Sequence, residues 1–183
     1  MHTKPAPIKT PAGYRPQCGK YALIRGAYRI LGDTTPIPAD CGKLCGAACC
    51  KGDGETGMLL FPGEAPRLAK IAGFRVLRID YMDTRQWLLI CEGTCDRNLR
   101  PLSCRIFPLA PKVHEDGSVT ARLDPRAMGV KCPLAIMRYL DSGFTERVSR
   151  VFSLLGGDPQ CLAFMRAVSG ELDELEILGL RQD

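Results

Sequence analysis

Apolar residues recur every three or four positions in two stretches of the first half of the chain, which is the spacing of an amphipathic helix. In residues 20–31, five apolar positions from Leu23 to Leu31 would share one face, and Gly32 follows directly. Glycine often ends a helix because it adopts the left-handed C-cap conformation without strain. The pattern therefore predicts a helix over 20–31, and a shorter one over 64–72 before Gly73.

Other stretches have the composition of β-strands or a second helical pattern. Runs rich in Val, Ile, Leu and aromatic residues predict strands, and an Asp-Gly pair between two such runs predicts a hairpin. After Pro133 the apolar spacing is helical again, in about three segments broken near 141–143 and 156–159. The predicted strands are 74–81, 86–91, 107–114 and 118–123.

These elements predict an α+β fold with a small antiparallel sheet flanked by helices. The cysteine-bearing loops between residues 33 and 62 are long for a compact domain, and a bound metal would organise them because coordination substitutes for a core. Residues 1–16 contain four prolines and predict an extended N-terminal arm. Residues 17–183 are interpreted as a single metal-binding domain.

The composition narrows the class of protein. The 183 residues are 45% hydrophobic and 25% charged, with a formal net charge of +5, which is typical of a soluble globular chain. No apolar run approaches the roughly 18 residues of a membrane helix, so no membrane association is expected. The first residues lack the apolar stretch of a secretory signal, and we expect a cytoplasmic protein.

Ten cysteines against two histidines are the unusual feature. Because cytoplasmic thiols are kept reduced, closely spaced cysteines predict metal ligands, with buried thiols or a disulfide as the alternative. The densest segment is Cys41-Gly-Lys-Leu-Cys45-Gly-Ala-Ala-Cys49-Cys50. A continuous helix would separate the sulfurs of Cys41 and Cys49 by about 12 Å, too far for one ion. The glycines after Cys41 and Cys45 favour a loop instead, and two metals are the other option.

A second segment holds Cys91, Cys95 and Cys104. Arg100 and Arg105 flank the last of these cysteines, and nearby cations lower thiol pKa values and offset the charge of a multi-thiolate site. We therefore predict that both arginines help to bind the metal centre. The alternative is that they are solvated surface residues.

Residues 41–108 resemble the cysteine-cluster family of zinc- or iron-chelating domains, the CxxCxxCC type. The resemblance rests on the Cys49-Cys50 pair, the Phe61-Pro-Gly-Glu64 turn, and the late segment from Cys91 through Arg100-Pro-Leu-Ser-Cys104-Arg-Ile-Phe-Pro108. The intervals before the cysteine pair are three residues long, where the family usually has two. The resemblance implies a metal site but no reaction. The family is similar to the cysteine-rich part of flagellin lysine methylases, which implies an alternative: a methyltransferase-related enzyme for protein lysine N-methylation with a structural iron–sulfur cluster.

The remaining cysteines divide by context. Cys132 precedes Pro133 at a predicted helix start, as the last ligand of bacterial ferredoxin runs precedes a proline, although a buried thiol fits equally. Cys161 lies in an apolar helical pattern and is predicted to belong to the core, while Cys18 is unassigned. The predicted metal ligands are Cys41, Cys45, Cys49, Cys50, Cys91, Cys95, Cys104 and Cys132.

An all-thiolate ligand set selects zinc or an iron–sulfur cluster over hard cations. The chain has no CxxC pair of the zinc-knuckle type, which favours a 4Fe-4S cluster slightly, with zinc as the alternative. We expect a metal-binding protein that acts in metal handling, in redox sensing or in support of a protein partner. Catalytic thiols of an oxidoreductase are a further alternative, and no catalytic residue is assigned.

Other chemistries find little support in the sequence. Residues 51–57 are glycine-rich but lack the GK[ST] ending of a phosphate loop. His114 adjoins an acidic turn and is expected to be exposed. Basic residues are interspersed with acidic ones, which argues against nucleic acid, and eight thiolates with two zinc ions would lower the net charge to about +1. The amphipathic stretch 171–180 is expected to pack on the core rather than on a partner.

Overall fold

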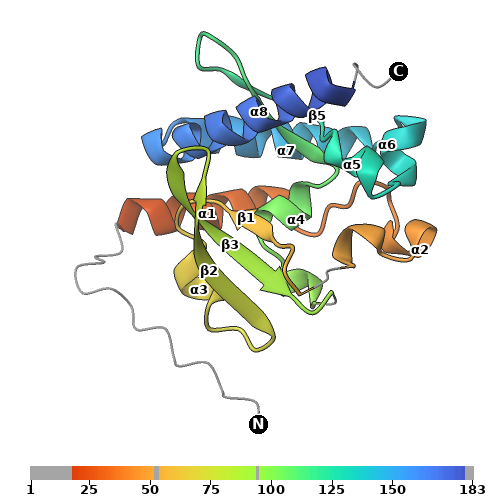
Figure 1. Cartoon of the computed structure of the whole chain (residues 1–183), viewed down its shortest axis with the longest axis horizontal. Coiled ribbons are helices and arrows are strands. Elements are labelled where there is room, and N and C mark those ends of the chain that lie inside the picture. Colours follow the sequence, from red (N-terminus) through yellow and green to blue (C-terminus); the bar gives the residue numbers. More distant parts are fainter. Residues whose placement is uncertain (1–17, 52–53, 94, 180–183) are drawn as a thin grey trace.

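The computed structural model describes residues 18–51, 54–93 and 95–179, and it has the predicted α+β architecture with small antiparallel sheets. One sheet has the strand order β1-β3-β2, and the other is the hairpin β4–β5. In Figure 1 the first sheet lies on one side of α1 and α4, while the hairpin and the two longest helices lie on the other. The strands are β1 (Met58–Leu60), β2 (Phe74–Tyr81), β3 (Thr84–Cys91), β4 (Leu109–Val113) and β5 (Val119–Leu123).

The helices follow the predicted pattern in the first and last parts of the chain. The predicted helix 20–31 is confirmed as α1, and the breaks predicted after Pro133 separate α6, α7 and α8. The side chain of Asp141 accepts a hydrogen bond from the Phe144 N–H and so caps α7. The helices are α1 (Cys18–Leu31), α2 (Gly42–Cys45), α3 (Ala65–Leu68), α4 (Leu102–Ile106), α5 (Arg126–Gly129), α6 (Pro133–Met137), α7 (Ser142–Gly156) and α8 (Pro159–Gly179), with the 3-10 turns η1 (Ala48–Cys50) and η2 (Arg97–Leu99).

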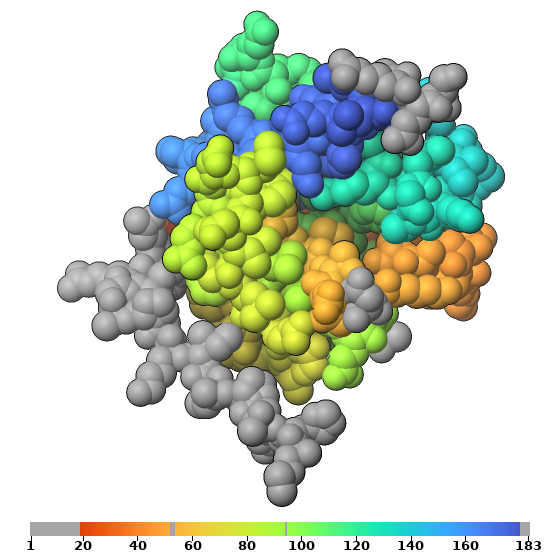
Figure 2. All heavy atoms as spheres, viewed as in Figure 1, coloured from red at the N-terminus to blue at the C-terminus, as the bar shows by residue number. Residues whose placement is uncertain are grey.

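The main core lies between α1, α4, α7, α8 and the β4–β5 hairpin. Ile24, Ala27 and Leu31 form the buried face of α1, as the apolar spacing predicts. A second cluster packs α3 against the three-stranded sheet through Leu68 and Val76. A third, smaller cluster joins α5 and α6 to the segment before α2. The α2 region therefore lies beside α5 and α6, as Figures 1 and 2 show.

Several predicted boundaries differ from the structure: the strand predicted over 107–114 forms only as β4, and two larger differences have a clear cause. The helix predicted over 64–72 is helical only as α3, because the chain turns at Ile71, whose carbonyl accepts from the Phe74 N–H at 3.2 Å, and enters β2. Strand β3 begins at Thr84, two residues earlier than predicted, because a two-residue turn at Met82 and Asp83 pairs Tyr81 with Thr84. Both turn residues have positive φ, which matches the twist of a tight hairpin.

The tip of the β2–β3 hairpin reaches across to α8, where Figure 2 shows the two in contact. The Tyr81 hydroxyl donates a hydrogen bond to Glu171. The predicted packing of the stretch 171–180 holds for its first turn, since Leu172 is fully buried. Farther along, Leu175, Ile177 and Leu178 are exposed. No helix within the described residues is long and apolar enough to span a membrane.

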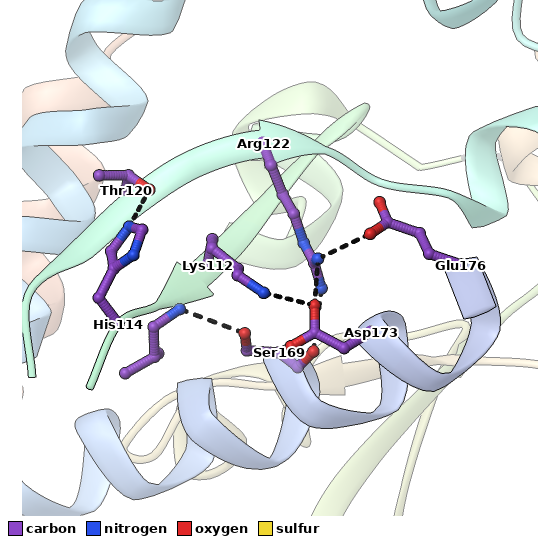
Figure 3. A network of polar contacts seen from close by, with 8 residues as sticks. Lys112, His114, Thr120, Arg122, Ser169, Asp173 and Glu176 are labelled. Atoms are coloured by element: carbon purple, nitrogen blue, oxygen red, sulfur yellow. Dashed lines mark hydrogen bonds and ion pairs between the residues drawn. The ribbon is translucent and has the colours of Figure 1, made fainter.

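Figure 3 shows the polar contacts that hold the β4–β5 hairpin on α8. Asp173 accepts from Lys112 at 2.6 Å and from Arg122 at 2.5 Å, and Arg122 also donates to the Ser169 carbonyl at 2.9 Å. His114 is exposed at the end of β4, as predicted, and contacts Thr120 at 2.8 Å. These contacts anchor the two basic strand residues on the acidic face of the helix.

Replacing Asp173 with asparagine should lower stability by about 0.5–1 kcal/mol near neutral pH, because the pair is partly exposed to solvent. Burial raises the pKa of Asp173, but Lys112 and Arg122 outweigh it and hold that pKa below its usual value. A depressed pKa means that the stabilisation is present above the unfolded pKa and is lost as the pH falls through the folded one. Urea unfolding from pH 6 to pH 2 should therefore show a smaller acid-dependent loss in the variant. An equal loss in both proteins would contradict this role.

Candidate metal centre

The early cysteine segment is a folded loop and not a continuous helix, which confirms the first of the two options. Cys41 precedes α2 and Cys45 ends it, while the vicinal cysteines lie in η1. The backbone between these turns is left-handed at Gly46 (φ 59°) and Ala47 (φ 56°). This reversal breaks the helix after one turn and folds the four sulfurs into one region of the molecule.

The other four candidate ligands come from distant parts of the chain. Cys91 is the last residue of β3, Cys95 lies in the loop between β3 and η2, and Cys104 lies in α4. Cys132 precedes α6 and is 9% exposed, so it is both a thiol at a helix start and a buried one.

We sort the eight candidate cysteines into two groups by which thiols act on one another electrostatically. The Cys49–Cys50 contact links the two groups. The first thiol group is defined around Cys41. Burial raises the pKa of the Cys41 thiol, and the negative charges of Asp40, Cys45 and Cys132 raise it further. The pKa of Cys49 is also raised, by its hydrogen bond to Cys50 and by burial, with Cys41 and Cys45 contributing. The first thiol group is therefore Cys41, Cys45, Cys49 and Cys132.

The second thiol group surrounds Cys104. Burial raises the pKa of the Cys104 thiol, and the nearby Cys50, Cys95 and Cys91 raise it further. Burial also raises the pKa of Cys95, more than the adjacent Arg100 lowers it. The second thiol group is therefore Cys50, Cys91, Cys95 and Cys104. Within each group a negative charge on one sulfur opposes ionisation of the next, so a cation is needed to hold all four as thiolates.

The vicinal pair Cys49-Cys50 is the junction between the groups, with its two sulfurs 4.0 Å apart. The hydrogen bond from Cys49, together with the positive charge of Arg100, lowers the pKa of Cys50 to about 6. Within the described residues, no three His, Cys, Asp or Glu side chains already stand in a metal-holding arrangement.

Two arginines supply positive charge beside the thiols. Arg100 contacts Cys95 and also acts on Cys50 and Cys104 of the second group. Arg97, which the sequence reasoning missed, acts on Cys41 of the first group and donates to the Thr34 carbonyl at 2.7 Å. The Nε atoms of both side chains are buried without a hydrogen-bond partner. An anionic thiolate centre would accept hydrogen bonds from these unpartnered N–H groups. The residues present therefore fit a thiolate-bound metal ion or cluster.

Arg105, the other arginine predicted to help bind the metal centre, makes its hydrogen bonds to the backbone. Its guanidinium donates to the carbonyl oxygens of Gly32 (3.1 Å), Arg97 (2.9 Å) and Arg100 (3.2 Å), and stacks on the Tyr28 ring. It therefore supports the backbone that carries Arg97 and Arg100, and is partly buried rather than a solvated surface residue.

The two cysteines outside the ligand set differ. Cys161 is fully buried in the main core, as predicted, and burial raises its pKa to about 12. Cys18 is the first residue of α1 and remains unassigned. The predicted N-terminal arm 1–16 and part of the glycine-rich turn 51–57 lie outside the described residues.

Comparison of the chain with protein-family models, curated proteins and solved structures finds no match. The resemblance to the cysteine-cluster family therefore stays a prediction. What the site can do has to be argued from the geometry of its own residues.

Proposed function

We propose that the chain is a metal-binding protein that holds zinc or an iron–sulfur cluster through cysteine thiolates. The proposal is supported by the electrostatic interaction of cysteines from four separate segments, by the 4.0 Å separation of the Cys49 and Cys50 sulfurs, and by the buried, unpartnered Nε atoms of Arg97 and Arg100 beside them. Four thiolates are the ligand set of structural zinc sites and of 4Fe-4S clusters alike. A role in metal handling, redox sensing or support of a partner protein follows from such a centre.

The charges around the site support this proposal over buried structural thiols. A buried structural thiol such as Cys161 packs among the apolar residues of the core and, within the described residues, has no second cysteine acting on it. The two thiol groups instead have guanidinium groups with unsatisfied donors beside them. The first thiol group also includes the cysteines at both ends of α2, a helix with no buried side chain of its own. Metal bound there would therefore contribute directly to the folding of this loop.

Titration of the reduced, metal-free chain with Co²⁺ tests the proposal. Cobalt bound by thiolates gives charge-transfer absorption from sulfur, which carboxylate or water ligands do not give. We expect this absorption to saturate at two equivalents per chain and zinc to displace the cobalt. Cobalt that binds without thiolate absorption, or does not bind, would contradict the proposal.

Arg100→Ala should weaken metal binding about 10–100-fold, the usual effect of removing a group that hydrogen-bonds a ligand. The physical reason is that its guanidinium faces three thiols of the second group and offsets their charge. Competition with a chromophoric chelator measures the affinity. The matched control is Arg85→Ala, since Arg85 forms only an exposed ion pair with Asp80 on the β2–β3 hairpin. Equal affinity in Arg100→Ala and in the unmodified chain would remove Arg100 from the centre.

A further inference from the structure

A cleft of about 300 Å³ opens between α1 and the segment that leads into α3. One wall is the exposed face of α1, on which aromatic and basic side chains alternate at helical spacing. The other wall is the turn at Gly63 and the start of α3. The residues that shape it are Tyr21, Arg25, Tyr28, Arg29, Glu64 and Arg67.

The backbone turn at Gly63 brings the two walls close together. Gly63 has φ +103°, and a Cβ atom there would lie 3.1 Å from Lys20 and 3.2 Å from Ile24 on α1. A side chain at this position would be strained and would push the walls apart. The narrow approach therefore depends on glycine, and it places Arg67 of α3 on the same side as the basic face of α1.

Three arginines against one buried carboxyl group give the cleft an excess of positive charge. Arg25, Arg29 and Arg67 are exposed, and none of them has an ion-pair partner among the described residues. Among the described residues, Glu64 is the one carboxyl group that lines the cleft, and it is 2% exposed. Its oxygens already accept from the Tyr28 hydroxyl (2.5 Å) and from two backbone N–H groups. Glu64 is thus a structural group at the floor of the cleft.

The tyrosine rings hold the guanidinium groups in place. The Arg67 guanidinium lies 5.0 Å from the centre of the Tyr28 ring, and that of Arg25 lies 5.7 Å from the centre of the Tyr21 ring. Stacking of this kind engages the flat face of a guanidinium and leaves its N–H edges free for hydrogen bonds. One N–H of Arg67 donates to the Asn98 carbonyl at 3.2 Å. A pre-organised guanidinium loses less freedom when it forms bidentate hydrogen bonds to an oxyanion.

We propose that this arginine–tyrosine cleft binds the phosphate group of a small molecule. Three guanidinium groups that form no ion pair among the described residues match a dianion better than the single charge of a carboxylate, and the fork of an arginine fits two phosphate oxygens. The volume is enough for a phosphate with a sugar or base attached, and it lies at the lower end of ligand-pocket sizes. The site is separate from the thiol groups, and the proposal does not rest on metal binding.

Isothermal titration calorimetry of the full chain against adenosine monophosphate, ribose 5-phosphate, inorganic phosphate and adenosine tests this proposal. We expect the phosphate compounds to bind and adenosine not to bind. Stronger binding of adenosine monophosphate would assign the site to nucleotides, and stronger binding of ribose 5-phosphate to sugar phosphates. Equal binding of all three would assign it to the phosphate group alone.

The double variant Arg25→Ala/Arg29→Ala should weaken this binding at least tenfold, because it removes two of the three guanidinium groups. Both side chains are exposed, so the circular-dichroism spectrum and the melting temperature should stay unchanged. Arg85→Ala, which removes one exposed charge outside the cleft, is the control and should bind like the unmodified chain. The proposal is overturned if no phosphate compound binds at millimolar concentration, if adenosine binds equally, or if the double variant binds normally.

Discussion

Replacing Cys95 with serine is expected to remove one of two metal equivalents from the chain and to leave the other in place. Cys95 belongs to the second thiol group, which shares no sulfur with the first. A hydroxyl is a poor ligand for a soft metal site. The loss of metal affinity should therefore exceed the roughly 100-fold loss caused by changing a residue that only supports a ligand. Cys95 is partly exposed, so the substitution does not bury a hydroxyl in the core. Elemental analysis of the purified variant measures the remaining metal.

The matching variants test the division into two groups. Cys45→Ser should remove the other equivalent, and the double variant should hold no metal. Cys161→Ala is the control, because Cys161 is buried in the main core, away from the ligand set, and should retain both equivalents. If either single ligand variant loses all metal, the eight cysteines form one centre and the division is wrong.

Glu64→Ala should lower the free energy of unfolding by about 3–5 kcal/mol, the largest stability effect we expect from one residue. The buried carboxylate accepts from Tyr28, from the Phe61 N–H at 2.8 Å and from the Leu102 N–H at 2.9 Å. Alanine would leave these donors without a partner, and each unsatisfied buried group costs about 1–3 kcal/mol. Because these contacts tie α1, α3 and α4 together, the loss should be global. Urea denaturation followed by circular dichroism measures it.

Two further variants make this prediction specific. Glu64→Gln keeps the shape and one acceptor oxygen, so it should cost less than the alanine variant. Glu146→Ala, at an exposed position of α7, should change stability by no more than about 0.5 kcal/mol. A loss below about 1 kcal/mol in Glu64→Ala would show that the hydrogen bonds of Glu64 contribute little to the fold.

The local pattern of the sequence predicts much of the fold because helices and hairpins follow from spacing over a few residues. The helix ending at Leu31 and the hairpin around Asp116 and Gly117 are found as predicted. Strand β1 was missed because its three residues are a strand only through their pairing with β3. The backbone just before β1 lies very close to β3, since a Cβ atom at Gly57 would lie 2.5 Å from the Leu89 carbonyl oxygen. A glycine beside a short apolar run is the one signal that could have indicated it.

The candidate site was predictable in its residues but not in its arrangement. Spacing alone predicts cysteines as a ligand set, but it does not show that Cys41 interacts with Cys132, or Cys50 with Cys104, because these interactions depend on the tertiary fold. Arg97 lies two residues after Cys95, and the same argument that identified Arg100 could have found it. Glu64 was recognised only as part of a turn, because nothing local shows that the fold buries a carboxyl group there.

Anaerobic purification of the full chain followed by elemental analysis and a visible spectrum tests the central claim most directly. The two thiol groups predict about two zinc ions in a colourless protein, or about four irons for each 4Fe-4S cluster with broad visible absorption. Alkylation of the native protein should then leave the eight ligand cysteines unmodified until the metal is removed. A chain that contains neither metal above background, with these thiols open to alkylation, would contradict the account.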